Sequence, residues 1–240
     1  MIVMKVVVVG LAGKLIENKL PEYGLKLNRK TPDVVISFGG DGTALYAERV
    51  YPGIPRVLIK HSKVCEKCKL GIHDFSKVLI ALKEKKYEII EEIKVEGVVN
   101  NNPKKKLIGL NEIGIHHKLP TKTIRLRVKV NGKIIEDEII GDGLVIATPY
   151  GSTAYFHSIT RKKFSKGLGI AFNNPKKRRK NVIVKDNSTI KVDILRGLGW
   201  MTADNDERMI PIKEGDVVTV KKAKGKARII ELKGKRRIRV

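Results

Sequence analysis

Aromatic and acidic side chains are both scarce in this 240-residue sequence. Phe, Tyr and Trp make up 5% of the residues, which leaves few side chains on which the bases of single-stranded nucleic acid can stack. Acidic residues number 25 against 50 Lys and Arg, a formal net charge of +25. Thermophilic adaptation alone raises Lys and Glu together, so this one-sided excess favours an anionic partner: a nucleotide, polyphosphate or nucleic acid. The alternative is solvated surface lysine in an organism whose proteins are basic throughout.

Long apolar runs are also missing. No run reaches the roughly 18–20 residues that a membrane-spanning helix needs. The first ten residues, MIVMKVVVVG, lack the basic region and the small-residue cleavage site of a secretory signal peptide. We therefore expect them to form a buried first strand in a cytoplasmic protein that has no membrane partner.

Cysteine occurs only at Cys65 and Cys68. With His61 and His73 these residues form the pattern H-x3-C-x2-C-x4-H, whose side chains are of the types that bind zinc. The order differs from that of common zinc modules, and a single C-x-x-C is a weak signal. The set is therefore a zinc candidate, with free thiols or a redox-labile pair as the alternative.

Strand-like and helix-like segments alternate over residues 1–87. The continuous apolar runs KVVVVG and DVVISFGG are typical of buried parallel strands. From residue 88 the pattern becomes β-branched and often alternating, and Asn131-Gly132 predicts a type I′ hairpin. We predict an α/β domain with a parallel sheet over 1–87, an all-β sandwich domain over 88–225, and one or more basic strands over 226–240.

The stretch SFGGDGT, residues 37–43, ends one predicted strand and opens a helix. Ligands of open α/β sheets bind at such points, and the N–H groups of a helix N-terminus can hold phosphate without the lysine of a P-loop. An aspartate beside phosphate is costly unless it binds a metal or takes a proton from an attacking hydroxyl. Asp41 therefore predicts phosphoryl-transfer chemistry, or else it is a helix N-cap.

Two later stretches point the same way. Asn111-Glu112 interrupts an apolar β pattern, and residues 141–158, GDGLVIATPYGSTAYFHS, place hydroxyl side chains after a strand and a turn. Together with GGDGT, in this order, they resemble the NAD kinases, the ATP- or polyphosphate-dependent enzymes that make NADP. Asp204-Asn205 is a weaker fourth match. The family's architecture, an α/β domain followed by a β-sandwich domain, agrees with the pattern above.

The resemblance implies that the chain phosphorylates the adenosine-ribose 2′-hydroxyl of NAD, with ATP or polyphosphate as donor and Mg²⁺ or another divalent cation bridging the donor phosphates. It implies Asp41 as the catalytic base. The implied phosphate-binding residues are Gly39, Gly40, Gly42 and Thr43, and the implied NAD-binding residues are Asn111, Glu112, Asp142, Thr153, Ala154, Tyr155 and Ser158. Family members are usually dimers or tetramers, so the resemblance also implies a homo-oligomer.

Three departures from the family pattern leave other readings open. Residues 60–73 replace a Gly-Ile-Asn…Gly…Leu-Gly-Phe segment, Tyr150 replaces a small hydroxyl residue, and residues 159–180 are basic where the family is apolar and proline-rich. The alternatives are a kinase of the same fold with a different hydroxyl acceptor, or a catalytically silent relative that binds nucleotide or nucleic acid.

Overall fold

The computed structural model of this protein describes residues 3–232, and the chain divides into two compact units. The first unit consists of residues 1–92 and 226–240, and the second of Ile93–Gly225. Two long strands, β6 (Tyr87–Val99) and β17 (Val217–Leu232), have residues in both units. Within residues 3–232, no helix is long and apolar enough to cross a membrane.

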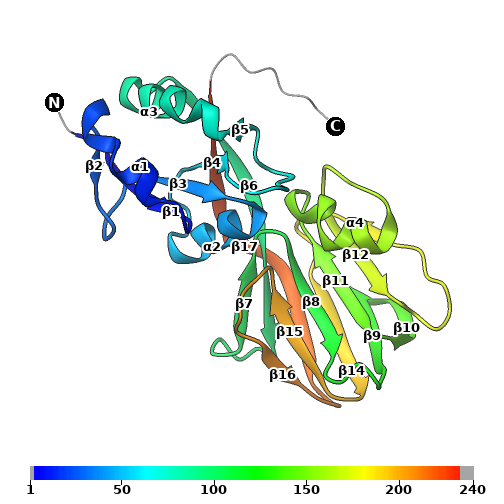
Figure 1. Ribbon diagram of the computed structural model, residues 1–240. Helices are drawn as coiled ribbons and strands as arrows, with labels where there is room; N and C mark the ends of the chain where they lie inside the picture. Colours follow the sequence, from blue (N-terminus) through cyan, green and yellow to red (C-terminus); the bar gives the residue numbers. More distant parts are fainter. Residues whose placement is uncertain (1–2, 233–240) are drawn as a thin grey trace. The chain divides into compact units, whose positions relative to one another are not determined.

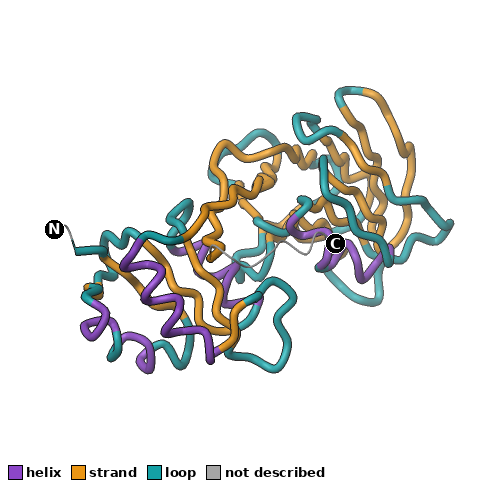
Figure 2. Tube along the Cα trace, turned by 90° about the horizontal axis from the view of Figure 1, so that it is seen from above, coloured by secondary structure: helices purple, strands orange, loops and turns teal. Residues whose placement is uncertain are grey.

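The first unit is built on a parallel sheet. Its strands lie in the order β2 (Lys26–Leu27), β1 (Lys5–Val9), β3 (Val34–Gly39), β4 (Arg56–Lys60) and β5 (Leu70–Gly71). The helical segments are α1 (Lys14–Glu17), η1 (Leu20–Tyr23), α2 (Asp41–Val50), η2 (Ile72–Asp74) and α3 (Phe75–Glu84). Figures 1 and 2 show these helices packed around the strands.

Both faces of this parallel sheet are buried. Val6 and Val8 of β1 belong to the apolar cluster that holds α1, η1 and α3, whereas Val7 packs in a separate cluster with Ala47 of α2. A strand covered on both sides needs apolar residues at every position. This explains the continuous runs that predicted it.

A buried ion pair fixes α2 against the sheet. The side chain of Arg56 on β4 is 0% exposed, pairs with Glu48 of α2, and donates hydrogen bonds of 3.2 Å to the carbonyls of Tyr51 and Ile54. Loss of either charged partner would leave the other charge buried and uncompensated. The pair therefore sets how α2 lies along β4, and with it the position of the helix N-terminus.

The second unit is a sandwich of two sheets. One sheet is antiparallel in the order β13-β12-β11-β8-β15-β16, and the other has β10-β9-β14-β17 with the β6-β7 pair. Its elements are β7 (Lys106–Gly109), β8 (Glu112–His117), β9 (Ile124–Val130), β10 (Lys133–Gly141), β11 (Gly143–Ala147), η3 (Tyr150–Thr153), α4 (Tyr155–Thr160), β12 (Leu168–Asn173), β13 (Val182–Val184), β14 (Ile190–Arg196), β15 (Gly199–Ala203) and β16 (Ile210–Ile212).

Alternating residues build the core of this sandwich. Leu126 and Val128 of β9 and Ile113 and Ile115 of β8 are buried in one cluster that both sheets share. Asn131 and Gly132 join β9 to β10 with φ values of 50° and 85°, the positive values that a type I′ turn requires. The predicted fold class, a parallel α/β region followed by an antiparallel β-sandwich, is confirmed.

The C-terminal segment, predicted as one or more basic strands over 226–240, begins inside a longer strand. Residues 226–232 continue β17 without a break at Gly225, and Ile229 pairs in parallel with Arg56 of β4. The sequence AKGKA contains no turn dipeptide, so the strand runs on. Residues 233–240 of that prediction lie outside the described residues.

Candidate active site

The glycine-rich loop joins β3 to α2, as its sequence predicted. Gly40 is the N-cap residue of α2, with φ −116° and ψ −167°, and Asp41 is the first helical residue. Because Gly40 occupies the N-cap position, the interpretation of Asp41 as the N-cap residue is wrong. Its carboxylate is instead directed to the loop of residues 61–68 that follows β4.

The loop has no room for side chains at its first two positions. A Cβ atom on Gly39 would lie 2.2 Å from Oγ1 of Thr43, and one on Gly40 would lie 2.9 Å from Oγ of Ser62. Gly10, at the end of β1, has φ +140°, and a Cβ there would lie 2.0 Å from the carbonyl oxygen of Phe38. Glycine is therefore needed at 39 and 40 for close packing, and at 10 for backbone conformation as well.

Asp41 is held by backbone groups of the 61–68 loop. The N–H of Glu66 donates to Oδ2 at 2.8 Å, and the N–H of Lys67 donates to Oδ1 at 3.0 Å. The same loop is tied to β3, because the His61 N–H donates to the Gly39 carbonyl at 2.9 Å and the His61 ring stacks on Phe38 at 4.4 Å. The candidate base is thus half-buried beneath the segment that departs most from the family pattern.

The predicted zinc set does not assemble. Cys65 and Cys68 form a disulfide, so neither sulfur is the thiolate that binds zinc. Among residues 3–232, no group of three or more His, Cys, Asp and Glu residues is placed to hold a metal ion. His61 is engaged with Phe38 and Gly39, and His73 lies exposed in η2. The alternative of a redox-labile pair is the one compatible with this geometry.

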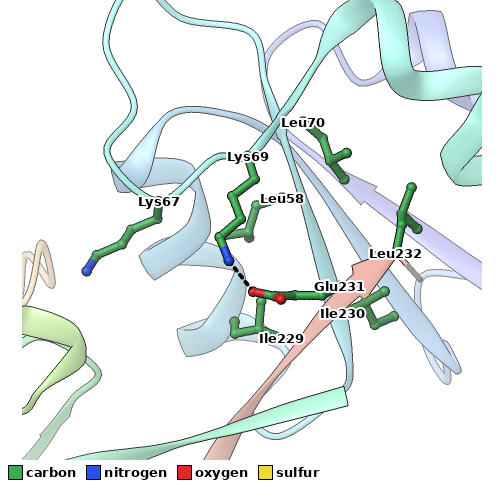
Figure 3. Close-up of a pocket in the computed structure, with 8 residues that line it drawn as sticks. All are labelled: Leu58, Lys67, Lys69, Leu70, Ile229, Ile230, Glu231 and Leu232. Atoms are coloured by element: carbon green, nitrogen blue, oxygen red, sulfur yellow. Dashed lines mark hydrogen bonds and ion pairs between the residues drawn. The ribbon is translucent and has the colours of Figure 1, made fainter. Parts of the chain in front are cut away.

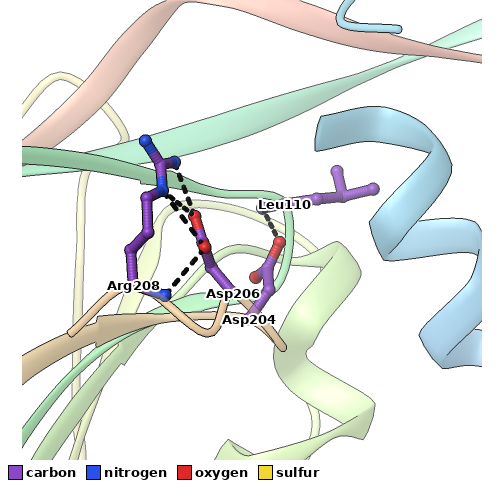
Figure 4. A network of polar contacts seen from close by, with 4 residues as sticks. All are labelled: Leu110, Asp204, Asp206 and Arg208. Carbon is purple, nitrogen blue, oxygen red and sulfur yellow. Dashed lines mark hydrogen bonds and ion pairs between the residues drawn. The ribbon is translucent and has the colours of Figure 1, made fainter. Parts of the chain in front are cut away.

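In the second unit, Asp204 fixes the segment that carries Asn111 and Glu112. Its carboxylate accepts hydrogen bonds from three consecutive backbone N–H groups, those of Leu110 at 2.7 Å, Asn111 at 2.8 Å and Glu112 at 3.1 Å. Figure 4 shows Asp204 directed at this turn, beside the ion pair of Asp206 with Arg208. The weak Asp204-Asn205 match in the sequence therefore marks a positioning residue.

The turn after β11 interlocks with the same segment. The Thr148 hydroxyl donates to the carbonyl of Leu110 at 2.6 Å and accepts from the Gly151 N–H at 3.0 Å. The Thr148 N–H donates to the Asn111 carbonyl at 2.8 Å, and a Cβ on Gly151 would lie 2.1 Å from that oxygen. The backbone of both segments is therefore fixed relative to one another without help from the candidate binding side chains.

Two of those side chains keep unused hydrogen-bonding capacity. Oδ1 of Asn111 and Oγ1 of Thr153 are buried and have no hydrogen-bond partner among the described residues. Buried polar atoms are almost always paired in folded proteins. Both atoms are therefore candidate hydrogen-bond partners for a polar ligand.

Tyr155 and Asp142 form a second group, together with two histidines that sequence reasoning left out. The Tyr155 ring stacks on His116 at 5.6 Å, and its hydroxyl accepts from Nδ2 of Asn173 at 3.0 Å. Burial, and then the negative charges of Asp142 and Glu112, raise the pKa of Tyr155. Burial lowers the pKa of His116, and the neighbouring His117 lowers it further. Both side chains are therefore uncharged near neutral pH.

The remaining candidates have local roles in the structure. The imidazole of His117 lies beside the carboxylate of Asp142, with Nε2 3.6 Å from Oδ1. The Ser158 hydroxyl donates to the Tyr155 carbonyl at 2.8 Å within α4. Ala154 links η3 to α4. Only the alternation of polar and apolar residues in EIGIHH could have drawn attention to His116 and His117.

Two cavities contain none of the predicted site residues. In the first unit, a pocket of about 50 Å³ lies beside the ion pair of Lys69 with Glu231 (Figure 3). That volume suits one or two water molecules and is too small for a nucleotide. In the second unit, a pocket of about 410 Å³ is lined by several basic side chains, which are Lys118, Lys122, Arg125 and Arg196.

The fold and the loop define a class of protein: an α/β unit with a glycine-rich loop at a helix N-terminus, joined to a β-sandwich. A family model described as the ATP-NAD kinase C-terminal domain matches residues 110–232, about half of the chain. The NAD kinase of Sulfurisphaera tokodaii is 34% identical over 165 residues, which are 68% of this chain and 63% of that protein. NAD kinase 1 of Halalkalibacterium halodurans is 31% identical over 176 residues, 67% of this chain and 58% of that protein.

This chain belongs to the NAD kinase family. Its matched part spans less than two thirds of the length of these two relatives. Solved structures share the fold: an NAD kinase from Archaeoglobus fulgidus in complex with ATP has a TM-score of 0.79 and 22% identity, covering 96% of this chain and 94% of that one. Yeast NADH kinase complexed with NADH has a TM-score of 0.80 and 14% identity, covering 95% and 83%.

Proposed function

We propose that this protein is a phosphotransferase that makes NADP from NAD, with ATP or polyphosphate as the phosphoryl donor. The observation that carries the proposal is the carboxylate of Asp41. It lies at the first position of α2, among the closely packed glycines of the loop, and Gly40 is the N-cap residue in its place. A carboxylate at a phosphate-binding helix end has a chemical use in phosphoryl transfer and little use in a protein that only binds.

The proposed reaction uses Asp41 as the general base. The 2′-hydroxyl of the adenosine ribose gives its proton to Asp41 while its oxygen attacks the terminal phosphorus of the donor. The bond from that phosphorus to the leaving oxygen breaks, and ADP or a shortened polyphosphate departs. The N–H groups at the start of α2, with Gly39, Gly40, Gly42 and Thr43 around them, would bind the donor phosphates.

The second unit would bind NAD. Oδ1 of Asn111 and Oγ1 of Thr153 would take the hydroxyl and amine groups of the adenosine half, and Tyr155 would supply an aromatic wall for it. Glu112, Asp142, Ala154 and Ser158 would complete the pocket as the family resemblance implies. Because its pKa is raised, the Tyr155 hydroxyl keeps its proton at physiological pH and remains a hydrogen-bond donor.

A divalent cation such as Mg²⁺ would neutralise charge on the donor phosphates. In such sites Mg²⁺ is usually held by substrate phosphates with one or two carboxylates, not by a protein cage. A homo-oligomeric state and a cytoplasmic location stay predictions, and sedimentation analysis of the purified protein tests the first.

The direct test is NADP formation from NAD, Mg²⁺ and either ATP or polyphosphate by the wild type and by Asp41→Asn. Removal of the base should lower kcat by about 10²–10⁴-fold. The matched control is Asp33→Asn, an exposed aspartate just before the opposite end of β3, which should retain wild-type activity. An active Asp41→Asn enzyme would remove Asp41 from the chemistry. Absence of NADP with both donors would point to another acceptor or to a silent relative.

A further inference from the structure

The disulfide loop over Asp41 is a site that the proposed reaction does not use. Cys65 and Cys68 close a ring around the two peptide groups whose N–H bonds reach the carboxylate, those of Glu66 and Lys67. The sulfur of Cys65 lies 3.3 Å from Oδ1 of Asp41, and the sulfur of Cys68 lies 3.9 Å from the Gly39 carbonyl oxygen. The disulfide is thus packed directly on the glycine-rich loop.

Two successive backbone N–H groups aimed at one anion form a small concave anion site. Here the anion is the protein's own carboxylate, and each of its oxygens accepts one of the N–H groups. Hydrogen bonds to an ionised carboxylate are among the strong ones in proteins. A substrate hydroxyl that needs Asp41 as its base must therefore compete with this loop for the same oxygens.

The covalent ring keeps both N–H groups directed at Asp41. Because only two residues lie between the linked cysteines, the backbone of 66 and 67 has few alternative conformations, whereas an open C-x-x-C segment has many. Both cysteines are only partly buried, so a reductant can reach them. Exposed disulfides are the labile and regulatory kind.

We infer that Cys65 and Cys68 form a reversible thiol–disulfide site, and that its oxidised state covers Asp41 and slows phosphoryl transfer. The effect on rate rests on the proposed function, whereas the contact between loop and carboxylate does not. In the forward step, a dithiol reductant attacks one sulfur through its thiolate and forms a mixed disulfide. Its second thiolate then displaces the protein thiol. The protein gains two electrons and two protons to become a dithiol, and the reductant becomes a disulfide.

The first experiment compares NADP formation by the oxidised protein and by protein equilibrated with dithiothreitol, with free thiols counted in the same samples. Reduction should release both thiols and raise kcat about tenfold, since strong hydrogen bonds to the carboxylate are lost. The double variant Cys65→Ser with Cys68→Ser should match the reduced wild type and ignore dithiothreitol. An unchanged or lower rate after both thiols appear would overturn the inference, as would a disulfide that dithiothreitol cannot reduce in the folded protein.

The second experiment has a readout that does not depend on activity. If the closed ring binds Asp41, then removing the carboxylate must make the disulfide easier to reduce. In dithiothreitol redox buffers, Asp41→Ala should shift the thiol–disulfide equilibrium toward the dithiol by about tenfold, or about 30 mV. Asp33→Ala should leave it unchanged. An equal equilibrium in wild type and Asp41→Ala would show that the contact is independent of the redox state and would overturn the inference.

The two experiments distinguish failure of the proposed function from failure of the redox inference. A protein that makes no NADP in either redox state, yet shows the equilibrium shift in Asp41→Ala, would retain the redox site and refute the proposed function. An enzyme that depends on Asp41 but whose rate is unchanged by reduction would support the proposed function and refute the redox inference.

Discussion

The two candidate clusters differ in what holds them. In the second unit, Asn111 and Thr153 are presented by segments that Thr148, Gly151 and Asp204 lock together through backbone hydrogen bonds. In the first unit, the Asp41 carboxylate is itself the acceptor for a neighbouring loop. The candidate binding atoms of the second unit are unpaired, whereas the candidate base of the first unit is already hydrogen-bonded. On the proposed function, the second unit is preorganised for its ligand, and the 61–68 loop of the first unit must move before Asp41 can act.

The largest effect is expected from Asp204→Ala. Three N–H groups would lose their acceptor at once, and an unsatisfied buried donor costs about 1–3 kcal/mol. Because water would reach some of them, we expect the free energy of unfolding to fall by about 2–4 kcal/mol. Urea denaturation measures it. Asp186→Ala, which removes an exposed ion pair with Lys222, should change little. Equal behaviour of the two variants would contradict the positioning role of Asp204.

In the first unit, Gly39→Ala tests whether the loop is as tightly built as its contacts show. The new methyl group would lie 2.2 Å from Oγ1 of Thr43, so the first turn of α2 must shift, at a cost of about 1–3 kcal/mol. The control is Gly71→Ala in the same unit, where a Cβ meets nothing within 4 Å. Thermal unfolding should separate the two variants. A Gly39→Ala protein as stable as Gly71→Ala would mean that the loop adapts without strain.

A comparison of variants at Thr148 and Thr153 tests which hydroxyl stabilises the fold and which binds the ligand. Thr148→Val removes a hydroxyl that both donates and accepts, and should lower the free energy of unfolding by about 1–3 kcal/mol. Thr153→Val removes a hydroxyl that has no partner within residues 3–232. It should leave stability unchanged but raise KM for NAD about fivefold to tenfold, the value of one hydrogen bond. Destabilisation by Thr153→Val with unchanged KM would reverse these assignments.

The smallest effect concerns pH. Because the pKa of His116 is lowered from 6.5 by burial, the unfolded chain takes up a proton near pH 6.5 that the folded protein does not. Stability is therefore lost as the pH falls from 6.5 through the folded pKa, with a slope of at most about 1.4 kcal/mol per pH unit. His116→Phe keeps the stack on Tyr155 and should flatten this slope, although His117 and Asp142 remain. Matching slopes in melting experiments from pH 7.5 to 5 would rule out His116 as the source.

Features that depend on short-range constraints were predictable from local sequence patterns. The runs of β1 and β3, the Asn131-Gly132 turn and the glycine-rich loop before α2 could all be predicted from the sequence. Burial on both faces, a positive φ and close packing, respectively, restrict the residues there directly. The cover over Asp41 was not readable. The hydrogen bonds to the Asp41 carboxylate come from two backbone N–H groups more than twenty residues away. Any residue except proline has such a group, so no sequence pattern marks them.

Long-range contacts explain the other differences as well. Asp204 reaches the backbone of residues 110–112 across more than ninety positions, so its sequence context revealed only a weak match. His116 of β8 meets Tyr155 of α4 because β8 pairs with β11 and Tyr155 packs against the apolar cluster that contains Val145 of β11. Strand β17 continues past Gly225, where Ile229 pairs with Arg56 of β4. The zinc prediction failed because ligand type and spacing do not determine whether two cysteines bind a metal or form a disulfide with each other.

The central claim is that the phosphoryl group is transferred to the adenosine-ribose 2′-hydroxyl of NAD with Asp41 as the base. In the most direct measurement, the reduced protein is incubated with NAD, Mg²⁺ and ATP whose γ-phosphate carries ¹⁸O. The ³¹P NMR spectrum of the product then shows which phosphate carries the ¹⁸O. We predict a labelled 2′-phosphate on NAD that forms with the wild type and not with Asp41→Asn. Label at another hydroxyl, or equal labelling by both proteins, would contradict it.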